Sequence, residues 1–91
     1  MRSHLPHRKD ANHGEIKRAL EMAGYSVQEL HAVGNGVPDL LAAKLGDTFL
    51  VEIKTAKGKL NKAQVDFIAG WKGRVEILTS VDDVIALERA R

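Results

Sequence analysis

The chain has no cysteine, few aromatic residues and no long apolar run, and these shortages exclude several classes of protein. Without cysteine there are neither disulfides nor thiolate metal sites, so the fold depends on packing, with help from a partner subunit where packing falls short. The N-terminal sequence MRSHLPHRKD lacks the apolar stretch of a signal peptide, and no segment is apolar over the length of a membrane span. We therefore expect a cytoplasmic protein in a reducing compartment.

What the chain does have is enough apolar sequence for one modest core. Its 91 residues are 44% hydrophobic, which fits a single compact domain. Residues 1–11 show no periodicity and are expected to be a flexible arm, which leaves the domain to residues 12–91. The net charge is only +2, but the segment from Lys54 to Arg74 contains six basic residues and one acidic residue. A basic face is often just solvated surface, so attraction to phosphate needs support from chemistry.

Three segments have the apolar periodicity of amphipathic helices. The first covers about 13–23 and stops at Gly24. The second is capped by Asn61, ends near Gly73 and has one inward-facing stripe. The third is capped by Ser80. The residues expected to face inward are Ile16, Ala19, Leu20 and Ala23 in the first, Gln64, Phe67, Ile68 and Trp71 in the second, and Val81, Val84, Ile85 and Leu87 in the third.

Short apolar runs separated by turn residues predict four strands, at about 25–33, 39–44, 48–55 and 74–79. A turn at Gly46-Asp47 joins the second strand to the third, in which Glu52 and Lys54 share one face and Ile53 points to the other. The element order is α-β-β-β-α-β-α. It predicts an α/β fold with a mixed four-stranded sheet flanked by helices.

Two acids should converge on this hairpin. Asp39 begins one strand and Glu52 lies near the end of the next, thirteen positions later, which suits strands joined by a tight turn. Two close carboxylates repel each other, and a divalent cation between them removes that penalty. Oxygen ligands without cysteine favour Mg²⁺ or Mn²⁺, and the Ile53 carbonyl could complete the set. Lys54 could hold an attacking water and offset charge on a phosphate during in-line displacement.

A Glu-x-Lys triplet alone is common on surface strands and carries almost no information. The joint pattern is more specific: G-V-P-D-L around Asp39, E-I-K-T-A-K-G-K-L from Glu52, and Gln64 in the next helix. With these motifs the chain resembles the VRR-NUC family of the PD-(D/E)XK nuclease superfamily over most of its length. The resemblance implies a restriction-endonuclease-like fold, phosphodiester cleavage that depends on Mg²⁺ or Mn²⁺, and a homodimer. It leaves a viral or phage origin open.

The resemblance also assigns roles to two helix residues, for which local capping is an alternative. Glu15 matches the family's acid on the first helix and would be a metal ligand, but Asn12-x-x-Glu15 also fits a capping box. Gln64 matches a glutamine beside the active site, but Asn61-x-x-Gln64 fits a capping box too. For Gln64 we favour the orienting role, because a polar group on a buried stripe needs a partner inside.

Basic residues on the loop after the third strand are candidates for phosphate contacts. Lys57, Lys59 and Lys62 could neutralise phosphates that flank the cut. With one Trp, one Tyr and two Phe, the chain gives little evidence for a base-stacking surface, and Phe67 and Trp71 are expected in the core. The histidines at positions 4, 7, 13 and 31 are expected to be solvated or to face DNA weakly.

These features predict a metal-dependent endonuclease. Asp39, Glu52 and the Ile53 carbonyl would bind the cation, Lys54 would position the water, and Glu15 and Gln64 would assist. The expected mode is structure-selective cutting of branched, junction or nicked DNA without sequence specificity. Two alternatives remain open: a nucleic-acid-binding or assembly module that does not cleave, and a plain αβ domain with a charged rim.

Overall fold

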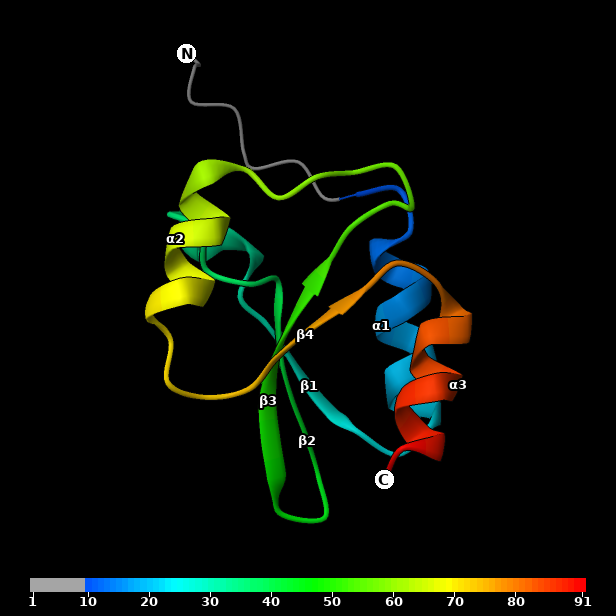
Figure 1. The fold of residues 1–91 in the computed structure, drawn as a ribbon. Helices are drawn as coiled ribbons and strands as arrows, with labels where there is room; N and C mark the ends of the chain where they lie inside the picture. The colour runs from blue at the N-terminus through cyan, green and yellow to red at the C-terminus, as the bar shows by residue number, and fades with distance from the viewer. Residues whose placement is uncertain (1–9) are drawn as a thin grey trace.

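The elements follow one another in the predicted order, with one short 3-10 helix added (Figure 1). The computed structural model describes residues 10–91. Its elements are α1 (His13–Met22), β1 (Ser26–Glu29), the 3-10 helix η1 (His31–Val33), β2 (Leu40–Lys44), β3 (Asp47–Ile53), α2 (Lys62–Gly70), β4 (Val75–Leu78) and α3 (Val81–Arg89). The predicted arm at residues 1–11 falls, except for its last two residues, outside this range.

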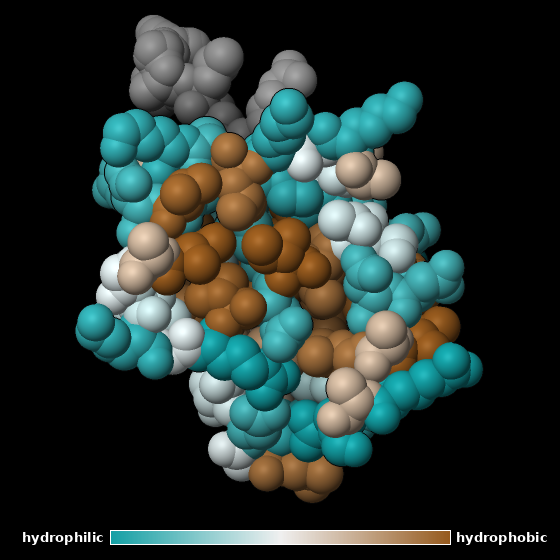
Figure 2. All heavy atoms as spheres, viewed as in Figure 1, coloured by the Kyte–Doolittle hydropathy of each residue, from teal (hydrophilic) through white to brown (hydrophobic). Residues whose placement is uncertain are grey.

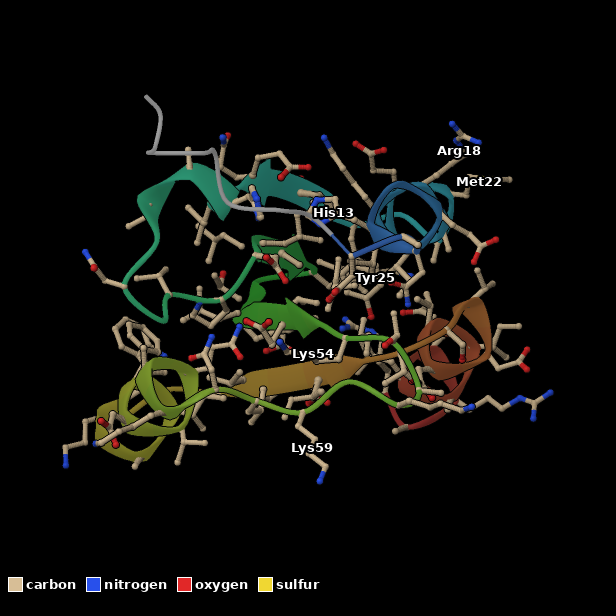
Figure 3. The ribbon with its side chains drawn as sticks, turned by 90° about the horizontal axis from the view of Figure 1, so that it is seen from above. His13, Arg18, Met22, Tyr25, Lys54 and Lys59 are labelled. Carbon is tan, nitrogen blue, oxygen red and sulfur yellow. The ribbon has the colours of Figure 1, made fainter. Side chains whose placement is uncertain are left out.

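The sheet is mixed and four-stranded, as the sequence predicted. Its strand order is β1-β2-β3-β4, with antiparallel pairs except for β3 and β4, which are parallel and connected through α2. Helices α1 and α3 lie on one face of the sheet and α2 lies on the other (Figures 1 and 3). Within residues 10–91 no helix has the length and apolar character needed to cross a bilayer.

The β2–β3 hairpin sets the register on which the site depends. Lys44 pairs with Asp47, so the two turn residues are Leu45 and Gly46, one position earlier than predicted. Both have positive φ, at 53° and 83°, which is the turn geometry that matches the right-handed twist of paired strands. From this turn the register runs to Leu40 opposite Val51, which brings the start of β2 beside the end of β3.

The main core lies between the sheet and the α1–α3 pair. Ile16 and Leu20 of α1 are fully buried, as the helical periodicity predicted. They pack with inward residues of the sheet and α3 that include Tyr25, Leu40, Phe49, Val51, Ile53, Leu78 and Val84. Ile85 was expected to face inward but is 47% exposed. In a short helix, Val84 takes the buried position and Ile85, one residue on, turns away from it.

Two predicted elements end three or four residues earlier in the structure, and the third strand ends at Ile53, two residues before its predicted end. The first strand stops at Glu29 and not near residue 33, because the chain turns into η1 after Leu30, whose backbone N–H donates to the Asp39 carbonyl at 2.7 Å. The second helix ends at Gly70 and not near Gly73, because Trp71 has extended backbone angles.

The expected core role of the α2 stripe is wrong. None of the α2 residues is buried, and Trp71 is 47% exposed while stacking on Phe67 with ring centroids 5.2 Å apart. Apolar side chains accordingly appear on the surface over α2 and β4 (Figure 2), where Val65 and Ile77 are about half exposed, at 49% and 46%. Helix α2 covers its face of the sheet only in part.

Candidate active site

A cavity of about 370 Å³ opens where β2 begins and β3 ends, between the loop before β2 and the first turn of α2. Asp39, Glu52, Lys54 and Gln64 all line it. The structure therefore brings together four of the predicted site residues, which come from three different elements or their ends. Convergence at the end of the hairpin follows from the register of β2 and β3.

Asp39 lies directly before β2 and is fixed there by a hydrogen bond to the backbone of β3. Its Oδ2 accepts a hydrogen bond from the Ile53 N–H at 2.9 Å. Continuing the β2–β3 register would place Pro38 opposite Ile53, and proline has no N–H to donate to the Ile53 carbonyl. The Pro38-Asp39 pair thus ends the ladder. Ile53 itself is not among the residues that line the cavity, so a ligand role for its carbonyl stays a prediction.

Glu52 is the buried acid of the site. Its side chain is 2% exposed, although it lies on a strand and carries an ionisable group. Burial, followed by the neighbouring charge of Asp39, raises the pKa of Glu52 to about 8, while the Lys54 ammonium acts in the opposite direction. Near neutral pH this carboxyl holds its proton in the absence of further positive charge.

Lys54 and Gln64 both approach Glu52. The Lys54 Nζ lies 3.9 Å from Glu52 Oε2, and Gln64 Nε2 donates to the same oxygen at 3.0 Å. Gln64 also completes a capping box: its Oε1 accepts from the Asn61 N–H and its own N–H donates to Asn61 Oδ1, both at 2.9 Å. The capping box predicted for Gln64 is therefore formed, and the other end of the same amide contacts Glu52, while an orienting role in catalysis stays a prediction.

The loop before β2 packs against the first turn of α2 without room for a side chain at Gly36. A Cβ built on this residue would lie 2.2 Å from the Ala63 carbonyl oxygen and 3.0 Å from the Gln64 nitrogen. The φ of Gly36 is +81°, which also favours glycine. This close approach holds the start of α2, and with it Gln64, against the cavity.

Glu15 is not brought to this cavity. The buried positions of α1 are His13, Ile16 and Leu20, and Glu15 lies exposed beside Ile16, outside the residues that line the cavity. The capping-box alternative is not formed either, because Asn12 makes no side-chain cap hydrogen bond. Asn12 instead donates to the carbonyls of Lys54 and Thr79, at 3.1 and 2.7 Å, and ties the start of α1 to the ends of β3 and β4. A ligand role for Glu15 stays a prediction with no contact in its favour.

Two cavity residues were missed by the sequence reasoning. Asp10 lines the cavity from the segment before α1, and its charge contributes to the raised pKa of Glu52. His31 lines it from η1, with Nδ1 3.2 Å from Asp39 Oδ1. Neither residue belongs to a motif or an apolar period, so only the three-dimensional arrangement reveals them.

The expectation that the histidines are solvated is wrong for the two that the structure describes. His13 is 3% exposed and its Nε2 lies 3.1 and 3.0 Å from the two carboxylate oxygens of Glu29. The side chain of His31 is 14% exposed. His4 and His7 lie outside the described residues.

The three lysines predicted to bind phosphate are exposed, and none of them lines the cavity. Lys57 and Lys59 are exposed on the segment between β3 and α2, and Lys59 points away from Lys54 (Figure 3). Lys62 opens α2 and pairs with Asp66 at 2.7 Å, with 88% of its side chain exposed. Their positions suit long-range contacts with a polyanion and exclude direct contact with Glu52 in this arrangement.

The donor set of the cavity fits a hard divalent cation. Within residues 10–91 no three His, Cys, Asp or Glu side chains form a group that could hold a metal alone. Asp39 and Glu52 would therefore need the Ile53 carbonyl and water as further ligands, which are donors that Mg²⁺ and Mn²⁺ accept. A buried acid pair that keeps a proton is also the arrangement that added positive charge would stabilise.

Comparison of the chain with family models, with curated proteins and with solved structures gives no match. The chemistry of the cavity is therefore inferred from its own residues.

Proposed function

We propose that this chain is an endonuclease that hydrolyses DNA phosphodiester bonds in the cavity between β2, β3 and α2 with the help of Mg²⁺ or Mn²⁺. The observation that carries the proposal is the burial of Glu52 beside Asp39 and Lys54. A buried acid that must share its space with a second acid costs stability, and a purely structural role has no need of it. A cation-binding role explains why both acids line one cavity.

Four residues of the cavity, and the backbone carbonyl of Ile53, have distinct tasks in this proposal. Asp39 and Glu52 would hold the cation together with the Ile53 carbonyl, and Glu52 would release its proton as it does so. When bound, such a cation supplies Lewis-acid polarisation of the scissile phosphate and neutralises part of its charge. The nucleophile is a water molecule, and it displaces the leaving oxygen of the phosphodiester in line.

Lys54 and Gln64 would orient this reaction. The Lys54 ammonium lies close enough to Glu52 to hold the attacking water beside the carboxylates, and it offsets charge that builds on the phosphate. Gln64 holds Glu52 through its amide nitrogen while its amide oxygen is committed to the helix cap. The orientation of the carboxyl is therefore tied to the first turn of α2.

The fold family, the selectivity for DNA structure and the oligomeric state are part of the same proposal. The element order, the mixed sheet and the placing of Pro38-Asp39 and Glu52-Ile53-Lys54 at one end of a hairpin support a restriction-endonuclease-like fold and membership of the VRR-NUC group. Exposed Lys57 and Lys59 would contact phosphates without reading sequence, which supports a preference for DNA structure over base sequence. Since residues 10–91 contribute one set of these acids, cutting two strands calls for a homodimer.

The test is a cleavage assay on duplex, single-stranded, flap and four-way-junction DNA with Mg²⁺, Mn²⁺ or EDTA. Wild type, Asp39→Asn and the matched control Asp47→Asn are compared, because Asp47 lies at the opposite end of β3 and pairs with Arg74. We expect cleavage with a cation in wild type and Asp47→Asn, and none in EDTA or in Asp39→Asn. Cleavage that persists in EDTA or in Asp39→Asn would refute the proposal, and DNA binding without any cleavage would favour a non-cleaving module.

A further inference from the structure

His31 lies beside the proposed cation site and is held there by the backbone. The Leu30 N–H donates to the Asp39 carbonyl at 2.7 Å, which extends the pairing of β1 and β2 by one residue. The next residue, His31, opens η1 and is thereby placed alongside the Asp39 side chain. Its Nδ1 lies 3.2 Å from Asp39 Oδ1, and both side chains are largely shielded from solvent, at 14% and 16% exposure.

The direction of this hydrogen bond follows from the chemistry of Asp39. An ionised carboxylate only accepts hydrogen bonds, so a bond from Nδ1 to an ionised Asp39 requires the proton on Nδ1. The other carboxylate oxygen already accepts the Ile53 N–H at 2.9 Å. With one of these donors on each oxygen, the plane of the carboxylate is fixed, and a cation could take the place of the proton through which Glu52 also hydrogen-bonds to Asp39.

A second histidine, His13, packs against the ring of His31. The ring of His13 meets that of His31 edge-on, with centroids 5.8 Å apart and an interplanar angle of 73°. His13 is itself buried at the start of α1 (Figure 3) and held by both oxygens of Glu29. Lys17 in turn lies 3.4 Å from Glu29. Helix α1 therefore reaches the site through His13 and His31, and not through Glu15.

We propose that His31 is a positioning residue of the cation site, which fixes the Asp39 carboxylate by donating its Nδ1–H to Oδ1. The inference deepens the proposed function and rests on it. Outer-shell hydrogen bonds to a ligating carboxylate restrict its rotation, and their removal typically lowers metal affinity by about 10- to 100-fold. A direct ligand role for the ring would use Nε2 and is compatible with the Nδ1–H bond to Asp39, so the variants described below must separate the two roles.

The test measures binding of Mn²⁺ to the DNA-free protein by isothermal titration calorimetry, and the tautomer of His31 by ¹⁵N NMR. Two variants separate the donor from the ring. His31→Phe keeps a ring against His13 but has no donor, whereas His31→Asn places an amide N–H near the position of Nδ1. Thermal unfolding and circular dichroism confirm that both variants are folded.

We expect His31→Phe to weaken Mn²⁺ binding by about 10- to 100-fold and His31→Asn to stay within about threefold of wild type. The Nδ1–H tautomer should dominate in wild type and lose that dominance in Asp39→Asn. Unchanged affinity in His31→Phe, or an equal loss in both variants, overturns the positioning role and leaves the nuclease proposal intact. If wild type itself does not bind Mn²⁺, the proposed function fails, and this inference fails with it.

Discussion

Replacing Glu52 by glutamine should change how the stability of the metal-free protein depends on pH. The folded-state pKa of Glu52 is raised by burial to about 8, against an ordinary value of 4.5. Between these two values the folded protein binds more protons than the unfolded chain, so the free energy of unfolding falls as the pH rises. The stability that Glu52 contributes in its neutral form is complete below pH 4.5 and is lost by about pH 8.

The size of this loss follows from the shift. One pKa unit corresponds to about 1.36 kcal/mol, which sets a ceiling on the order of 5 kcal/mol for the whole interval. Relaxation of the cavity around the ionised carboxyl lowers that figure, and we expect a loss of about 2–3 kcal/mol. Glu52→Gln keeps the size of the side chain and an oxygen that can accept from Gln64, but it cannot ionise. The decline that Glu52 causes should therefore disappear in the variant.

The assay is urea unfolding in EDTA from pH 5 to pH 8.5, with wild type, Glu52→Gln and Glu76→Gln compared at equal m-values. Glu76 is a glutamate on the neighbouring strand β4 and serves as the matched control, which should keep the decline of wild type. All ionisable groups other than the substituted one are common to the three proteins, so the difference between the curves isolates Glu52. A difference below about 0.5 kcal/mol across this range would refute the assignment of a buried, protonated Glu52.

Three further predictions concern the surroundings of the cavity. Gly36→Ala should destabilise the protein by about 2 kcal/mol or more in chemical unfolding, since its Cβ meets the Ala63 carbonyl at 2.2 Å; stability equal to wild type would contradict this packing. Ser80→Ala removes the cap of α3 and should cost about 1 kcal/mol without changing Mn²⁺ affinity, and a calorimetric titration would expose any change. Lys57→Gln and Lys59→Gln should each reduce the salt slope of DNA binding by about 0.9, as measured by fluorescence anisotropy, and an unaltered slope would remove them from the DNA contact surface.

The hairpin and the acid pair were accessible to sequence reasoning because both obey local rules. Alternation along β3, continued to Lys54 directly after it, places Glu52 and Lys54 on one face. The tight turn sets the register that brings Asp39 opposite Glu52. The convergence of these three residues on one cavity was therefore predictable. The raised pKa of Glu52 was predictable only in direction, since its burial depends on α2 and the loop before β2.

The stripe on α2 shows where such reasoning stops. Helical periodicity identifies an apolar stripe but does not say how much of it another element covers. Only part of α2 packs on the sheet, so Phe67 is partly buried and Trp71 lies about half exposed at 47%. Gln64 nevertheless lies beside the acids of the cavity, as predicted, because its contact with Glu52 depends only on the first turn of α2.

Nothing in the sequence indicated the contacts that His13 and His31 make. His13 and His31 are eighteen positions apart, belong to no motif and gain their roles from Glu29 and Asp39, which are their neighbours only after the strands have paired. The reverse holds for Glu15, which fits a family pattern but lies on the exposed side of α1. Contacts between elements, and not spacing within one element, decide both outcomes.

The most direct test of metal-dependent hydrolysis at this cavity separates binding from chemistry at Lys54. Lys54→Gln and the exposed control Lys72→Gln are compared for cleavage of a labelled four-way junction in Mn²⁺, with the affinities for DNA and Mn²⁺ measured on the same preparations. We predict that Lys54→Gln loses about 100-fold or more in cleavage rate while both affinities stay within about threefold. A cleavage rate in Lys54→Gln equal to that of wild type would contradict the assigned chemistry.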